Sequence, residues 1–253
     1  MSHTLGVPWA AMRLRRPGVR RRLRSGWRWV ADTPHRVGVR RLGGDRKYRG
    51  YLRVQLRRSL SKRANDSGVG SRVLIDQIAE DIPPRGSRVL CVGCRNTVEL
   101  NEFRARGFAD VVGIDLYSQH PDILVMDMHD MTFADESFDV IFASHSLEHS
   151  YDLERVVDEI VRVARHGALV AVEVPVRGQR GDADLLVFGN VAELRDAFGR
   201  HVGEVLTAEE RPSRSETNDQ GTDVARLVFR IVKQPVLTTD TATSWREVDD
   251  TRR

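Results

Sequence analysis

The sequence predicts an α/β fold, a mainly parallel sheet with helices on both faces, preceded by a basic helical arm. From about residue 70 onward, short and almost wholly apolar runs alternate with segments of helical period. Such runs are typical of parallel strands that are buried on both faces. Charge divides the chain in the same way, because residues 1–65 hold 17 Arg and 2 Lys against 2 Asp, a balance of +17 in a chain of net charge +4. The remainder therefore carries −13, and a basic arm joined to an acidic domain is expected.

Two segments are expected ahead of the sheet. Residues 1–45 combine Gly, Pro and Arg without a sustained period, which predicts a flexible basic tail. In residues 46–69, apolar side chains recur at every fourth position among Arg and Lys, which predicts a basic amphipathic helix followed by a linker. These apolar side chains are Tyr48, Leu52, Leu56 and Leu60. We expect the stripe that they form to pack on the neighbouring domain.

The domain itself is expected over residues 70–235, with strands and helices in alternation. Its first five strands are predicted at 88–92, 111–116, 123–126, 138–143 and 168–174. The accompanying helices are predicted at 73–80, 99–106 and 152–167. Gly107 is the expected stop of the second helix, Asp152 the expected N-cap of the third and Gly167 its stop.

The last part of the domain breaks the alternation. A helix is predicted at 191–198, then a strand at 202–207, a polar link and a strand at 225–232. Because no helix separates these two strands, an antiparallel pair is expected at the edge of the sheet. Residues 236–253 are polar and predict a frayed tail.

Composition narrows the cellular setting. Two cysteines in 253 residues do not form a disulfide framework, so a reducing compartment is the simplest interpretation. No apolar run approaches the roughly 18 residues of a membrane span. The start of the chain also lacks the charged-then-apolar order of a secretory signal. A cytoplasmic protein without a transmembrane segment is therefore expected.

The ends of the predicted strands carry the polar residues that matter for function, since ligands bind beyond the carboxyl ends of strands in an open parallel sheet. Gly93 follows the first strand and lets the backbone turn close to a ligand. Asn96 and Glu99 have the spacing of a capping box, which would direct helix amides toward the same loop. Asp115 ends the second strand 22 residues after Gly93, a spacing typical of the carboxylate that binds ribose hydroxyls.

Four stretches in this order resemble a known family. They are VLCVGC, VVGIDL, MDMHDMTFADESFDVIFASHSLEH and EIVRVARHGALVAVEVP. The series resembles the class I S-adenosylmethionine-dependent methyltransferases, especially the methyltransferase type 11 group that contains the ubiquinone-biosynthesis enzymes. The resemblance implies a Rossmann-like three-layer sandwich with seven strands, mostly parallel, and an antiparallel C-terminal strand. It also implies S-adenosyl-L-methionine as the cofactor.

The resemblance further implies which side chains contact the cofactor. Asp115 would accept the ribose hydroxyls, and Asp127 would accept from the adenine amino group. The other implied contacts are Val92, Gly93 and Cys94 at the methionine part, Leu116 and Met128 beside the adenine, and Ser144 and His145 across the pocket.

The first loop departs from the family pattern. Cys91 stands where the family usually has an acidic residue, and Arg95 and Thr97 replace further glycines. The carboxylate that normally helps to hold the methionine amino group is therefore missing. We expect Arg95 to compensate by pairing with the cofactor carboxylate, since a guanidinium matches that group in two hydrogen bonds.

The acceptor is expected to be a small molecule, a glycan or a lipid-linked intermediate, with O-methylation favoured over N- or C-methylation. His149 and His145 are the candidate general bases, because histidine titrates near neutral pH. Segments 45–62 and 178–190 are candidate lids over the acceptor, and no metal is predicted. The basic arm makes a nucleic-acid partner possible through phosphate contacts. It is not favoured, because the Asn/Asp-Pro-Pro-Tyr motif of amino-methylating enzymes is absent.

Four other interpretations remain open. Cys91 and Cys94 form a C-x-x-C pair, although Cys91 lies inside a predicted strand rather than at a helix start. His145 to His149 match the H-x-x-E-H zinc-protease motif, but that motif needs one continuous helix. The chain is alternatively a catalytically weak or inactive scaffold on a methyltransferase fold, or an RNA methyltransferase tethered by its basic N-terminus.

Overall fold

The computed structural model describes residues 27–32, 35–40, 46–61, 69–118, 120–178, 181, 184–211 and 223–233. The predicted C-terminal tail, 236–253, lies outside these ranges, as does most of the predicted N-terminal tail. No helix among the described residues combines the length and the apolar character that crossing a bilayer requires.

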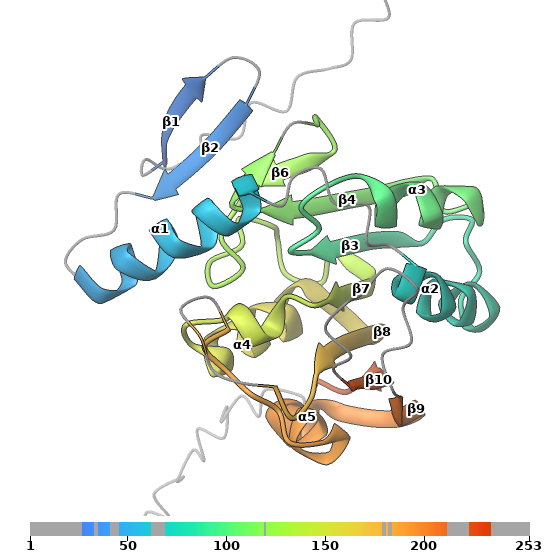
Figure 1. Cartoon of the computed structure of the whole chain (residues 1–253). Helices are drawn as coiled ribbons and strands as arrows, with labels where there is room; N and C mark the ends of the chain where they lie inside the picture. The colour runs from blue at the N-terminus through green and yellow to red at the C-terminus, as the bar shows by residue number, and fades with distance from the viewer. Residues whose placement is uncertain are drawn as a thin grey trace, which may run out of the picture.

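A seven-stranded sheet forms the centre of the domain, in the order β6-β4-β3-β7-β8-β10-β9 (Figure 1). Its strands are β3 (Arg88–Val92), β4 (Asp110–Asp115), β6 (Ile123–Val125), β7 (Phe138–Ser144), β8 (Ala164–Pro175), β9 (Val202–Arg211) and β10 (Val224–Ile231). The first five strands pair in parallel, whereas β10 is antiparallel to both β8 and β9. This arrangement confirms the predicted fold class, including the antiparallel strand near the C-terminus.

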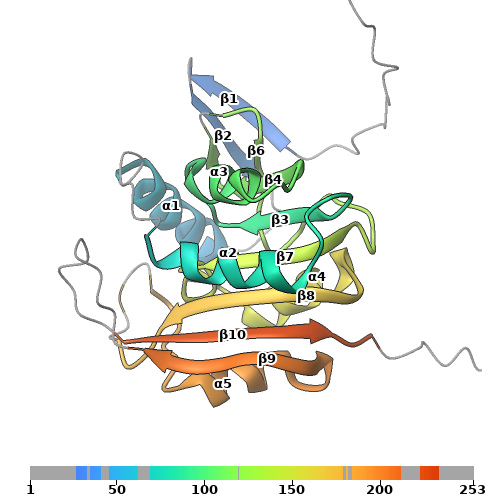
Figure 2. The ribbon, with the colours of Figure 1, turned by 90° about the vertical axis from the view of Figure 1, so that its right-hand side faces the viewer.

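Helices cover both faces of the sheet (Figure 2). The helices α2 (Val69–Asp81) and α3 (Val98–Ala105) pack on one face, where Leu74 and Phe103 join one apolar core. The helices α4 (Leu153–Val163) and α5 (Val191–Phe198) supply the second core on the other face. Strands that are apolar on both sides serve both cores, which is why they show no polar alternation.

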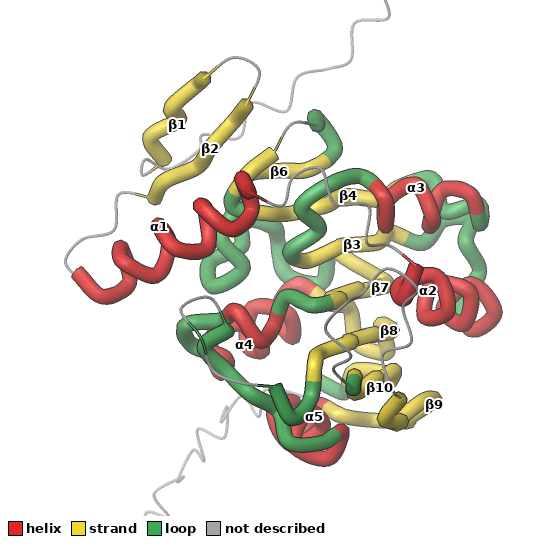
Figure 3. Tube along the Cα trace, in the orientation of Figure 1, coloured by secondary structure: helices red, strands yellow, loops and turns green. Residues whose placement is uncertain are grey.

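The strand order reverses beside β3. The chain runs outward from β3 to β4 and β6, then returns to β7 on the other side of β3. Such a reversal opens a crevice at the carboxyl ends of the strands. Figure 3 shows loops at these ends of the strands, toward α1.

Most predicted boundaries agree with the structure to within one or two residues, and two differences have clear causes. The helix α4 ends at Val163 rather than at Gly167, because Ala164 is already paired with Phe138 and fully buried in β8. The predicted capping box of α3 is absent. Thr97 is the N-cap without a side-chain bond, and Asn96 accepts from the amide of Val98 at 3.1 Å.

A small second sheet lies at the N-terminal side, where the sequence predicts only a tail. The strands β1 (Trp27–Asp32) and β2 (His35–Arg40) form a hairpin, and β2 pairs with β5 (Tyr117–Ser118). The pairing of β2 with β5 joins segments about 80 residues apart. A local period carries no signal of such pairing, and the sequence therefore does not reveal these strands.

The predicted basic helix is present as α1 (Arg46–Ser61), but it turns a different face inward. Its buried side chains are Tyr51 and Gln55, whereas Leu52 and Leu56 stay half-exposed. Tyr48, the first residue of the predicted stripe, does contact the domain and donates to Asp127, whereas the leucines of the stripe are only partly buried. The helix instead lies across the carboxyl ends of the strands, where polar side chains contact the loops (Figure 1).

Candidate functional site

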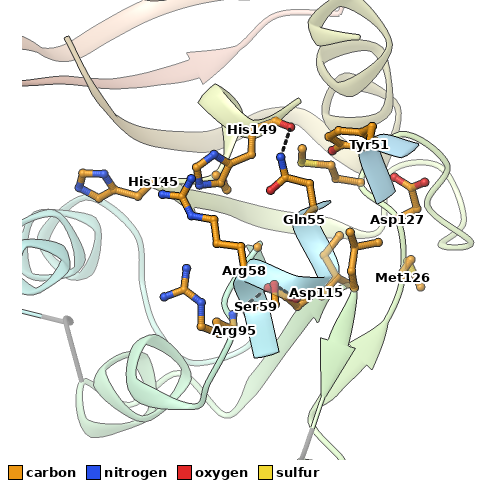
Figure 4. A pocket seen from close by; sticks show the side chains of 15 residues that line it. Tyr51, Gln55, Arg58, Ser59, Arg95, Asp115, Met126, Asp127, His145 and His149 are labelled. Atoms are coloured by element: carbon orange, nitrogen blue, oxygen red, sulfur yellow. Dashed lines mark hydrogen bonds between the residues drawn. The ribbon is translucent and has the colours of Figure 1, made fainter. Parts of the chain in front are cut away.

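A pocket lies at the carboxyl ends of β3, β4, β6 and β7, and one face of α1 closes it (Figure 4). Its space measures about 560 Å³, including the part open to solvent. Eight predicted site residues line it together, namely Gly93, Arg95, Asp115, Leu116, Asp127, Met128, His145 and His149.

Gly93 shapes the first loop of the pocket. Its backbone has a φ of +74°, a left-handed conformation that glycine adopts without strain. A Cβ at this position would lie 2.6 Å from the Cβ of Ser146, across the pocket floor. Its amide donates to the carbonyl of Ile114 at 2.8 Å, which holds the loop against the end of β4. Any side chain here would therefore displace the loop from β7.

Replacing Gly93 by alanine is expected to destabilise the fold by about 1–3 kcal/mol, because the substitution adds backbone strain to the contact with Ser146. Urea unfolding measures the change. Gly178→Ala is the matched control, since no atom of the described residues lies within 4 Å of the Cβ it would add. A Gly93→Ala protein as stable as the control would show that the loop adapts at no cost.

Asp115 ends β4 and is held by three donors. Its Oδ1 accepts from the amide of Tyr117 at 3.0 Å and from the hydroxyl of Ser59 at 3.1 Å, and its Oδ2 accepts from the amide of Arg95 at 3.1 Å. Burial raises the pKa of this carboxyl, and the hydrogen bonds oppose that rise without cancelling it. The carboxylate is thus fixed in direction but poorly solvated, which favours the binding of additional donors.

Asp127 follows β6 and has a comparable set of partners. It accepts from the ring Nδ1 and the amide of His129, at 2.8 and 3.0 Å, and from the hydroxyl of Tyr48. Burial opposes its ionisation, but the bonds to His129 and Tyr48 outweigh burial and lower its pKa. The rings of Tyr48, Tyr51, His129 and Tyr151 pack around it with centroids 5.2–5.7 Å apart.

The helix α1 forms one wall of the pocket. The sequence predicts this only in general terms, by assigning the segment 45–62 as a candidate lid. Tyr51, Gln55, Arg58 and Ser59 all line the pocket. Their spacing of three or four residues places them on one face of a helix. A search for polar side chains at that spacing would have found this face, whereas the predicted stripe followed only the apolar ones.

Arg95 marks the end of the pocket where the methionine part of a cofactor is expected. Its guanidinium Nε is buried and has no hydrogen-bond partner among the described residues, and the hydroxyl of Ser146 is in the same state. Burial raises the pKa of nearby Glu99 to about 7, although Arg95 opposes the rise. Buried donors that lack a partner, next to carboxyl groups that burial desolvates, are suited to bind a ligand group that carries both a positive and a negative charge.

The comparisons with known proteins agree with this geometry. Residues 90–172 match the family model described as a methyltransferase domain. Over these residues the chain is similar to methyltransferase domains. The matched region runs from β3 into β8, so it includes every strand whose carboxyl end contributes to the pocket.

One curated relative and two solved structures define the similarity further. The methyltransferase GfsG of Streptomyces halstedii is 32% identical over 106 residues, which are 41% of this chain and 35% of that protein. The match thus spans about a third of the length of this relative. The 1,6-didemethyltoxoflavin-N1-methyltransferase of Burkholderia thailandensis, crystallised with its acceptor and S-adenosylhomocysteine, superposes with a TM-score of 0.58 at 15% identity, covering 83% of this chain and 100% of the other.

The [4+2]-cyclase SpnF gives a TM-score of 0.53 at 17% identity, covering 74% of this chain and 95% of the other. At these identities the two structures show the fold alone. The cyclase shows that proteins of the methyltransferase fold catalyse other reactions, so function has to be argued from the site.

Three predicted cofactor contacts of the methyltransferase domain lie away from the pocket. The side chain of Val92 packs in the core on the α4 face. Cys94 is buried on the opposite side, and its sulfur occupies the space that a Cβ on Gly113 would need. Ser144 donates to Glu173 at 3.3 Å. Packing in the core keeps the side chains of Val92 and Cys94 out of the pocket lining. The hydrogen bond to Glu173 on β8 keeps Ser144 out of it.

Behind His145, the methyltransferase domain contains a buried charge network. Glu173 bonds Nε2 of His145 at 3.2 Å and Nε of Arg226 at 2.6 Å. Burial opposes the ionisation of Glu173, but His145 and Arg226 outweigh it and lower its pKa to about 2. His145, in a left-handed backbone conformation, has its pKa raised because Glu173 and Glu148 outweigh its desolvation. His145 thus has a charged anchor on its far side.

His149 stands at the other end of the pocket in a short 3₁₀ turn, Leu147–His149. Its carbonyl accepts from Gln55 of α1 at 3.5 Å, and its Nδ1 lies 2.9 Å from Asp184. The expected N-cap Asp152 is confirmed, since its side chain accepts from the amide of Arg155. The H-x-x-E-H stretch therefore precedes α4 and is not one continuous helix, which does not fit the zinc-protease interpretation.

The cysteines of the methyltransferase domain lie in the core. Cys91 is fully buried within β3 and Cys94 is 4% exposed. Burial raises the pKa of both thiols well above the ordinary value. A reactive thiol needs an accessible site and a lowered pKa, so the structure does not fit the redox interpretation.

Proposed function

We propose that the chain is an S-adenosylmethionine-dependent methyltransferase that methylates a hydroxyl of a small-molecule, glycan or lipid-linked acceptor. One observation carries the proposal. Asp115 and Asp127, which end neighbouring strands of a methyltransferase domain, line the same pocket as the Gly93 loop and His149. The two carboxylates that would bind a nucleoside thus share one pocket with the candidate base, which supports the proposal.

The residues present fit the cofactor. Asp115 would accept the ribose hydroxyls and Asp127 the adenine amino group, with Leu116 and Met128 beside the ring. Arg95 would bind the methionine carboxylate, since its buried Nε has no partner among the described residues. When bound, S-adenosylmethionine supplies an electrophilic methyl group on a positively charged sulfur.

The protein contributes position, exclusion of water and a proton acceptor. The face of α1 covers the pocket, and the loops after β3 and β7 fix its floor. Holding an acceptor oxygen in line with the methyl group supplies most of the acceleration that such a transfer needs. His149 would take the proton that the acceptor hydroxyl loses, with Nε2 as the accepting atom.

A binding measurement followed by a transfer assay tests the proposal. Calorimetry is expected to show saturable binding of S-adenosylmethionine and S-adenosylhomocysteine, and labelled cofactor is expected to transfer its methyl group to a component of fractionated cell extract. His149→Ala should keep binding and lower transfer by about 100-fold or more, the contribution of a general base. Absence of binding to the wild-type protein would refute the proposed function.

A second candidate is a binding or scaffold protein on the same fold. The observation that favours it is that hydroxyls of α1 already occupy the two nucleoside carboxylates, Ser59 on Asp115 and Tyr48 on Asp127. Binding of cofactor without methyl transfer to any extract fraction would support this candidate over the enzyme.

A further inference from the structure

We propose that Asp184 and Arg58, which come from two separate segments beside the pocket, are positioning residues that orient His149 as the base for a hydroxyl acceptor. The inference rests on the proposed function, because it specifies how the base of that reaction is assembled. It also defines the acceptor as one whose oxygen must lose a proton.

The three side chains form a short chain of contacts. Oδ1 of Asp184 lies 2.9 Å from Nδ1 of His149 and 2.6 Å from Nη1 of Arg58. The side chain of His149 is only 14% exposed, whereas that of Asp184 is 39% exposed. The contacts therefore run from a partly solvated carboxylate inward to a nearly buried imidazole that lines the pocket.

This contact selects one form of the imidazole ring. A carboxylate accepts only from a protonated nitrogen, so Asp184 favours the tautomer with hydrogen on Nδ1. Nε2 is then the ring atom that can accept a proton from an acceptor hydroxyl. Oε1 of Glu148 lies 3.6 Å from Nε2, beyond hydrogen-bond distance, and its charge would stabilise Nε2 once that atom is protonated. A carboxylate in this position also stabilises the imidazolium that forms when the proton arrives.

Arg58 keeps the carboxylate in place. Asp184 lies on the connection between β8 and α5, and its pKa is lowered by its bond to His149 and by Arg58. Without the guanidinium, a side chain on this connection would be free to turn toward solvent. The same connection is tied down by the amide of Leu186, which donates to the carbonyl of Glu148 at 3.0 Å.

The contributing segments come from distant parts of the chain. Arg58 lies on α1, which also reaches His149 through Gln55, whereas Asp184 follows the sheet strand β8. These are the two segments predicted as acceptor lids. Both meet at His149, so the base has its full set of partners only where both segments contact the pocket.

A cation site is the competing explanation for the same cluster. Glu148, His149 and Asp184 each offer a ligand atom, and these atoms lie within 4.8 Å of one another. The guanidinium of Arg58, 2.6 Å from Asp184, already supplies the positive charge that a metal ion would bring. We therefore assign the cluster to proton transfer, and the experiment below includes a metal arm.

The test uses the full chain and the variants Asp184→Asn, Asp184→Glu and Arg58→Gln. Arg57→Gln and Asp158→Asn are matched controls, because both side chains are exposed. Proton–nitrogen correlation spectra of protein with ¹⁵N-labelled histidine are expected to show a downfield proton resonance on Nδ1 of His149. Asp184→Asn should remove this resonance, because an amide is a weaker hydrogen-bond acceptor than a carboxylate. Asp184→Glu should restore part of the signal, and both controls should leave it unchanged.

Activity gives the second readout. With labelled S-adenosylmethionine and the extract fraction that accepts methyl groups, Asp184→Asn should lower kcat at least tenfold and change the KM for the cofactor less than twofold. Arg58→Gln should lower kcat in the same direction, and Asp184→Glu should recover part of the loss.

The outcomes separate the two proposals. An unchanged His149 signal in Asp184→Asn would overturn the inference, as would activity that EDTA abolishes and Mg²⁺ or Mn²⁺ restores. Failure of the wild-type protein to bind S-adenosylmethionine would instead refute the proposed function, and the spectra would still show whether Asp184 holds the ring.

Discussion

Replacing Asp115 by asparagine is expected to weaken the binding of S-adenosylmethionine by about 100-fold or more. Two ribose hydroxyls would lose a charged acceptor, and each hydrogen bond to a charged group contributes about 1.5–3 kcal/mol. The asparagine keeps a side-chain oxygen for the amide of Tyr117 and the hydroxyl of Ser59, but it loses the oxygen that accepts from the amide of Arg95. Calorimetric titration with S-adenosylmethionine measures the change.

The same substitution should not reduce the stability of the protein. Burial raises the pKa of Asp115, so near neutral pH the folded state holds a carboxylate that it disfavours. Removing that charge relieves the burial penalty but leaves the amide of Arg95 without its acceptor, so the two effects oppose each other and the melting temperature should change little. Asp110→Asn, at the exposed start of the same strand, is the control. Binding by Asp115→Asn within threefold of this control would contradict the assigned role of the carboxylate.

Replacing Arg226 by methionine is expected to destabilise the fold by about 3–5 kcal/mol, because it leaves the buried carboxylate of Glu173 without its guanidinium partner. Both side chains are less than 10% exposed, and their contact is 2.6 Å long. Arg230→Met is the matched control on the same strand. Its ion pair with Glu204 is partly exposed and 3.7 Å long, so it should cost under about 1 kcal/mol.

The pH dependence of stability gives a second measure of this network. The pKa of Glu173 falls from an ordinary 4.5 to about 2 on folding. A lowered pKa adds stability that is fully present above about 4.5 and is lost as the pH falls toward 2. Urea unfolding across this window should show a shallower acid loss in Arg226→Met. An equal loss of stability in Arg226→Met and Arg230→Met would mean that the buried pair has no special role.

The sequence predicts the central sheet well because the physical signal there is local. Residues 88–92 and 138–143 are short apolar runs that end at polar or flexible residues. A strand that is buried on both faces has apolar side chains at nearly every position, so such a run is recognisable in the sequence. The hairpin at 27–40 lacks that signal. Among the described residues, the hairpin pairs through β2 with β5. This strand lies far along the chain, and only the tertiary structure brings β2 and β5 together.

The candidate site divides in the same way. Gly93, Asp115 and Asp127 follow predicted strands, and the rule that ligands bind at strand ends places them together in advance. Gln55 and Arg58 lie 30 residues or more before the first strand of the main sheet, on a helix whose inner face was predicted from its apolar side chains. Their contribution depends on which face of α1 is turned inward. The packing of Tyr51 sets this rotation, whereas the period of the apolar side chains predicts a different inward face.

Under the proposed function, the docked position of α1 would also affect how a nucleoside enters and leaves. Because the hydroxyls of Ser59 and Tyr48 bind the carboxylates of Asp115 and Asp127, an incoming ribose or adenine has to share or displace these contacts. Binding of the nucleoside would then take two steps, in which movement of α1 precedes or accompanies binding. The observed rate of binding would level off as the nucleoside concentration rises. The time for which a product stays bound would likewise be set by how often the helix lifts.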